Sequence, residues 1–252
     1  MKQLFLFVLT TFFVQTSFCQ NLSDTINVEY SKNSPKRFSM SISPLPSGLA
    51  LNSLPNLNQF LKAQRIPNSN LDNISTYFPF GITYQANRFK ILYELNFGTT
   101  TTSDRENNYS TTFDMKNGSI STGYAFFADR NNFVYFNLGI GYGEHKKTIN
   151  KFNPQSTSLA SALQNGVGQS IILRNTQGFI DVGLEFFNRT QGKRIGQCIR
   201  LGYRYGLKET PWSSQFINLS DAPSDRISSI YLEGFINIPY LSKKERANST
   251  NN

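Results

Sequence analysis

Charged residues recur four positions apart in three segments of this chain. Because the side chains of an extended strand alternate between its two faces, residues four apart share a face. A tight turn at residues 192–193 would place Glu185 opposite Arg200 and Asp181 opposite Arg204, with Cβ atoms about 5 Å apart. Together with Glu233 they form a predicted interior charge network, which consists of Lys90, Glu94, Asp181, Glu185, Arg200, Arg204 and Glu233.

Two functions of such a network are open. Charged side chains inside a barrel can line a gated path or a binding pocket. They can also fill the interior as ion pairs, because eight strands leave room for side chains only and buried charges need partners. We favour the second interpretation, a salt-bridged plug without an open pore.

His145 is the only histidine, and an imidazole beside a serine can act as the base of a hydrolytic site. Its neighbour Glu144 would point to the opposite strand face, and the residue two positions on is Lys147 rather than serine. We therefore expect a solvated histidine at the base of an outer loop, with no catalytic or cofactor-binding residue and no cofactor. One histidine and Cys198 do not make a zinc cluster, so we expect no metal site.

The elements that position these residues are strands with two different faces. In residues 89–97, Phe89, Ile91 and Tyr93 fall on one face, and Lys90 and Glu94 fall on the other. This period of two predicts a strand between unlike environments. Eight segments show it, near residues 37–43, 77–86, 89–97, 120–126, 134–142, 180–186, 199–207 and 230–238.

The connections between these segments alternate in length. Long ones are predicted at residues 44–76, 103–117, 144–175 and 208–225, and short turns at residues 87–88, 129–132 and 191–194. This parity is typical of outer-membrane barrels. The predicted fold is therefore all-β: an eight-stranded antiparallel up-and-down transmembrane β-barrel with short periplasmic turns and long extracellular loops.

Some of the loops carry local patterns of their own. Leu57 and Leu61 have helical spacing, and residues 158–163 would suit a brief helix. The loop aromatics Phe60, Trp212 and Phe216 are predicted exposed contact residues. The alternative for each is packing onto the barrel mouth, because large apolar side chains usually find cover.

The ends of the chain predict export and an envelope location. Residues 1–19 resemble a cleavable signal peptide, with Lys2 before an apolar run. Residues 20–36 form a polar lead-in, residues 37–241 the barrel, and residues 242–252 a disordered polar tail. The net charge of +9 is scattered along the chain, which favours a solvated surface, or contact with phosphate-bearing glycolipid, over nucleic acid.

This pattern of strands and connections resembles the small eight-stranded outer-membrane barrels: the OmpA membrane domain, the OmpX and Ail group, and the PorT-like barrels. The resemblance covers most of the chain that follows the predicted signal peptide. It implies a non-enzymatic integral protein of the outer membrane, with surface loops for structural support, adhesion or partner contact. The implied partners are outer-membrane lipid, lipopolysaccharide, and envelope or surface proteins. The alternatives are an accessory barrel of a protein secretion system and an outer-leaflet lipid-modifying enzyme.

Overall fold

A computed structural model of the chain describes residues 37–43, 47–64, 66, 73–104, 108–129, 131–152, 168–189, 196–214 and 221–239. The predicted signal peptide, lead-in and tail lie outside these residues. So do Phe216, the turn at 191–194 and the brief helix at 158–163.

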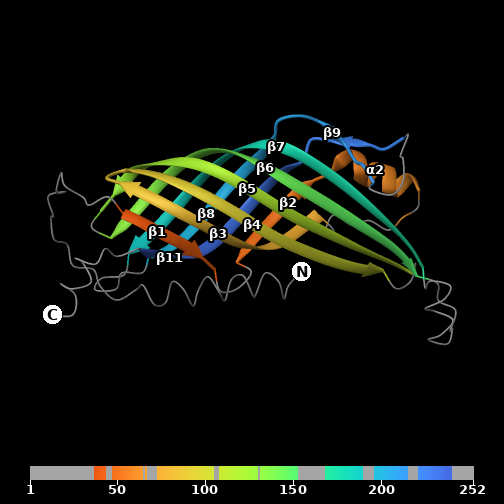
Figure 1. Cartoon of the computed structure of the whole chain (residues 1–252), viewed down its shortest axis with the longest axis horizontal. Coiled ribbons are helices and arrows are strands. Elements are labelled where there is room, and N and C mark those ends of the chain that lie inside the picture. Colours follow the sequence, from red (N-terminus) through yellow and green to blue (C-terminus); the bar gives the residue numbers. More distant parts are fainter. Residues whose placement is uncertain are drawn as a thin grey trace. The chain divides into compact units, whose positions relative to one another are not determined.

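The described residues form an antiparallel sheet that closes on itself (Figure 1). The strands of the sheet are β1 (Arg37–Ile42), β2 (Gly48–Ser53), β3 (Ile74–Ala86), β4 (Phe89–Asp104), β5 (Tyr109–Ala128), β6 (Asn132–Phe152), β7 (Gly168–Arg189), β8 (Gly196–Gly206) and β11 (Ser228–Pro239). From β3 to β8 each strand pairs with the next along the chain, and β11 pairs both with β8 and with the first strands β1 and β2.

The first position of the ring is divided between two strands. Both β1 and β2 pair with β3 on one side and with β11 on the other. The nine strands therefore occupy eight positions around the ring, as the predicted fold class requires. The prediction that a long loop begins at residue 44 is wrong, because residues 48–53 return to the sheet and continue the interrupted strand.

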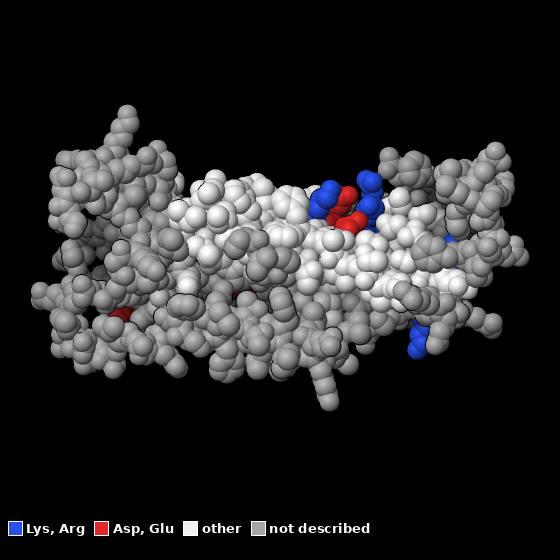
Figure 2. All heavy atoms as spheres, turned by 90° about the horizontal axis from the view of Figure 1, so that it is seen from below, with Lys and Arg blue, Asp and Glu red and all other residues white. Residues whose placement is uncertain are grey.

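The outward faces of the strands are apolar and the inward faces are largely polar. On β6, Phe136, Leu138 and Ile140 are each about half exposed or more, although they are large apolar side chains. Their inward neighbour Asn137 is buried. Figure 2 shows one outer face, where the described surface is a long uncharged stretch with charged side chains gathered toward one end. An exposed apolar belt around a polar interior is the pattern of a barrel whose outer face meets lipid.

Three strands extend well past this belt. β5, β6 and β7 are 20, 21 and 22 residues long. The long loops predicted at residues 103–117 and 144–175 are therefore partly wrong, because much of each is strand. The pairing of β6 with β7 continues as far as Phe152 and Gly168.

The two ends of the ring differ in their connections. At the end that we call the short-turn end, Asn87 and Arg88 join β3 to β4, and Asn87 takes a positive φ of 54°. A second tight connection there is closed by a hydrogen bond from the Asp129 amide to the Asn132 carbonyl. Asparagine tolerates this left-handed conformation, which suits it to a hairpin turn.

The opposite, long-loop end carries helix α2 (Pro55–Ala63) and the small ladder of β9 (Thr210–Pro211) with β10 (Ser224–Asp225) (Figure 1). The helix confirms the spacing of Leu57 and Leu61, both of which are buried. Among the described residues, no helix has the length and apolar character needed to cross a membrane.

Candidate functional site

The seven residues of the predicted network all point into the barrel. They lie on β4, β7, β8 and β11, and none is more than 5% exposed. The pairing of β7 with β8 places Glu185 opposite Arg200 and Asp181 opposite Arg204, which is the register that the sequence predicts. The next strand pair places Glu233 opposite Arg200.

Arg200 is the centre of this network. Its Nη1 lies 2.6 Å from Oε2 of Glu94 and 2.7 Å from Oε1 of Glu233, and its Nη2 lies 3.0 Å from Oε2 of Glu185. One guanidinium thus joins carboxylates from three strands. The planar fork of arginine allows this, because it directs several N–H groups in fixed directions.

Arg204 and Lys90 extend the network in opposite directions along the barrel. Arg204 lies 3.1 Å from Asp181 and 3.1 Å from Glu94, and Lys90 forms an ion pair with Glu185. The seven side chains carry three formal positive and four formal negative charges. Tyrosine hydroxyls share the negative charge, because Tyr77 donates to Glu233 at 2.9 Å and Tyr231 donates to Asp181 at 2.6 Å.

Aromatic rings fill the space around the cations. The guanidinium carbon of Arg204 lies 4.1 Å from the ring centre of Tyr231, and Nζ of Lys90 lies 4.5 Å from that of Tyr135. A Cβ atom at Gly202 would come within 2.4 Å of the Tyr231 ring. At Gly202 the absence of a side chain therefore makes room for the Tyr231 ring.

A second, apolar layer fills the barrel toward the long-loop end, and we call it the cap. Its buried members include Leu54, Leu57, Leu61, Tyr77, Phe113, Met115, Ile149, Leu173, Trp212 and Ile227. Trp212 is only 1% exposed, so its prediction as an exposed contact residue is wrong and the alternative of packing onto the mouth holds. Phe60 is half-buried against the same cap.

Asp225 ties the cap together. Its carboxylate accepts hydrogen bonds from the backbone amides of Asn56 and Leu57, at 2.9 and 3.0 Å, and from the indole Nε1 of Trp212 at 2.8 Å. The first amides of a helix have no partner within the helix, so Asp225 caps α2 from a distant segment. Sequence reasoning missed this residue, because its partners are 13 or more positions away.

His145 lies inside the barrel rather than at a loop base. It is 5% exposed, and its ring stacks on Phe113 with ring centres 5.9 Å apart. The prediction of a solvated loop histidine is wrong because β6 continues to Phe152 and turns this side chain inward. The residues paired with it are Met115 and Asn175, so no hydroxyl faces it in either register.

A third layer closes the short-turn end. Phe133 and Tyr135 are buried there with Ala125, and Phe187 packs against them. The Tyr135 hydroxyl accepts a hydrogen bond from Nε2 of Gln85 at 2.7 Å. In the described part of the chain, no group of three or more His, Cys, Asp or Glu side chains is arranged to hold a metal ion.

No family model and no curated protein matches the chain. Solved structures do match. A major outer membrane protein from Thermus thermophilus is 8% identical, with a TM-score of 0.52 over 82% of this chain and 100% of that one. Neisserial surface protein A is 10% identical, with a TM-score of 0.45 over 82% and 98%. The Ail attachment protein of Yersinia pestis is 15% identical, with a TM-score of 0.43 over 82% and 100%. At these identities the Thermus likeness concerns the fold alone, which is that of an outer-membrane β-barrel.

Proposed function

We propose that this chain is an integral outer-membrane protein without enzymatic activity, whose closed barrel carries loops for structural support, adhesion or partner contact. The long-loop end faces outward from the cell and the short turns face the periplasm. One observation carries this proposal: the barrel interior is filled in successive layers, by the network around Arg200 and by the cap around Trp212. Filled layers stop ions and leave the outer surface as the place for contacts.

The energetic argument for a closed interior comes from the cost of isolating the charges. Arg200 and Arg204 are each 2% exposed, and their carboxylate partners are similarly buried. An ion or solute passing through would have to separate pairs whose disruption costs several kcal/mol. The network therefore acts as a permanent plug rather than as a low-cost gate.

Planar-bilayer recording tests the closed state. We expect the purified wild-type protein to give no large, stable conductance steps. The Asp225→Ala variant should stay closed as well, because it loosens only the cap and the intact charge network still blocks the barrel. Removing both Arg200 and Arg204 should raise conductance in protein that still folds. Large stable steps from the wild type would contradict the proposal.

Fractionation and gel migration test the compartment separately. We expect the protein in the outer-membrane fraction, with an apparent mass that changes on heating, as folded barrels show. Recovery in the soluble fraction would refute the location and the inside-out polarity together.

A further inference from the structure

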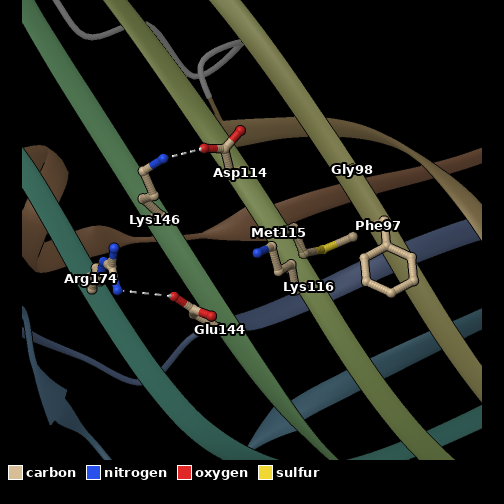
Figure 3. Close-up of a pocket in the computed structure, with 8 residues that line it drawn as sticks. All are labelled: Phe97, Gly98, Asp114, Met115, Lys116, Glu144, Lys146 and Arg174. Carbon is tan, nitrogen blue, oxygen red and sulfur yellow. Dashed lines mark ion pairs between the residues drawn. The ribbon is translucent and has the colours of Figure 1, made fainter.

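A hollow of about 430 Å³ opens on the outward face of β4 to β7, just beyond the apolar belt. Phe97 and four charged side chains from β5 and β6 line it together with Arg174 of β7 (Figure 3). A pocket of this volume is large enough to hold part of a ligand. We call it the outward hollow, and the charged residues that line it are Asp114, Lys116, Glu144, Lys146 and Arg174.

The strand register places these charges at one level of the barrel. Lys116 is paired with Phe97 on one side and with Glu144 on the other. On the same outward rows, Phe97 and Tyr142 are 50% and 61% exposed. The hollow therefore lies where the surface changes from apolar to charged, which in a membrane barrel is the level of the lipid headgroups.

The cations of the hollow are only partly used by the protein. Lys146 lies 3.1 Å from Asp114, but Arg174 approaches Glu144 only to 3.8 Å, and its buried Nε has no hydrogen-bond partner among the described residues. Lys116 is exposed, and although Glu144 is its neighbour in the strand register, no carboxylate in the part of the chain that the structure describes forms an ion pair with it. Ion pairs this exposed contribute little to stability, so an incoming anion can open them at small cost.

The arrangement fits one kind of ligand. Lysine and arginine together favour a phosphate group, because the guanidinium binds it through a fork and the ammonium adds a point charge. Phe97 beside them offers an apolar wall that a free phosphate would not use. A molecule that carries phosphate next to acyl chains satisfies both surfaces.

We infer that the outward hollow binds the phosphate group of an acylated glycolipid of the outer leaflet. Lys116 and Arg174 hold the phosphate, and an acyl chain lies along Phe97 and the belt beneath it. This inference rests on the proposed location and orientation of the barrel, and it adds a specific lipid site that a general lipid-facing surface does not require.

Native mass spectrometry in neutral detergent tests the site, with diphosphorylated lipid A as the probe. We expect the Lys116→Gln/Arg174→Gln variant to bind this lipid about tenfold more weakly than the wild type, since it loses two charge-assisted contacts. The matched control is Lys62→Gln/Lys151→Gln, which removes the same charge from exposed positions outside the hollow. It should bind like the wild type, and lipid A stripped of both phosphates should not distinguish the variants.

Three outcomes would overturn the inference. The first is that the two double variants bind diphosphorylated lipid A with equal affinity. The second is that the affinity difference between the variants is as large for the dephosphorylated lipid. The third is that inorganic phosphate binds the protein as tightly as the lipid does. The single variant Lys116→Gln, at an exposed position, covers the case in which the double variant fails to fold. Heat-dependent gel migration of each sample reports folding independently, so a failure of the barrel proposal is distinguishable from a failure of the lipid site.

Discussion

At the scale of single residues, Arg200 is notable because all three of its carboxylate partners lie within 3.0 Å of its guanidinium nitrogens. Its guanidinium contacts Glu94, Glu185 and Glu233, which come from three other strands. A buried ion pair adds little over an apolar pair of the same shape, but removing one partner leaves uncompensated charge. Losing Arg200 should therefore cost more stability, through the unpaired carboxylates left behind, than its ion pairs add over apolar residues of the same shape.

We expect the Arg200→Ala variant to lose about 3–5 kcal/mol of unfolding free energy, because three buried carboxylates lose their shared cation. Urea unfolding in lipid vesicles, followed by gel migration, measures it. The control Arg226→Ala removes an exposed arginine that bonds to Tyr205 and should cost less than about 1 kcal/mol. Equal losses in the two variants would argue against a central role for Arg200.

At the scale of elements, Asp225 joins α2 to the β9–β10 ladder. The helix starts at Pro55 with no side-chain cap from its own N-cap residue, Leu54. Asp225 supplies the missing acceptor from β10 and is fully buried. Two loops far apart in the sequence are thereby joined within the cap.

Replacing Asp225 with asparagine should lower stability by about 1–3 kcal/mol, because one of its oxygens accepts from both Leu57 and Trp212. Trp212 is the only tryptophan, so tryptophan fluorescence reports on the cap alone. We expect a red-shifted emission and easier quenching by acrylamide. Asp221→Asn, an exposed change in the same segment, is the control and should leave the emission as it is.

The elements also show how far the sequence predicts the structure. Alternation marks the strands wherever one face meets lipid and the other a polar interior, as at Leu138 and Asn137. Beyond the belt both faces carry polar residues, such as outward Lys146 and inward Lys147, so the period of two disappears while the strand continues. That loss hid the outer part of β6 and led to the wrong placement of His145.

Contacts between distant segments are harder to predict from the sequence than strand register. A turn position and a count along two strands predict the pairs Glu185–Arg200 and Asp181–Arg204. Nothing local relates Trp212 to Asn56 and Leu57, because their meeting depends on how two separate loops fold over the barrel. The charge network was therefore predictable from the residues, and the cap was not.

At the scale of the whole molecule, the apolar belt decides where the barrel can reside. Leu138 is the middle of five outward apolar side chains on β6, which run from Val134 to Tyr142, and it is 52% exposed. Such a surface is costly in water and favourable in hydrocarbon. A location in which water surrounds the belt is therefore energetically unfavourable for this barrel.

The Leu138→Arg variant should destabilise the inserted barrel by about 2–4 kcal/mol, since a charge then faces the hydrocarbon near its middle. Unfolding from vesicles of defined composition measures this. The same change at Asn150, which faces outward on β6 beyond the belt, should cost less than about 1 kcal/mol. Similar costs at both positions would contradict a lipid-facing belt at Leu138.

The pairing of β11, the last of the described strands, has a consequence for the order of assembly. β11 lies between β8 and the first strands β1 and β2, and it carries Glu233, which completes the set of carboxylates around Arg200. Until β11 is in place, two strand edges are open and the guanidinium lacks one partner. Sealing the ring and completing the contacts of Arg200 are therefore the same event, so the barrel gains its full stability only when β11 docks.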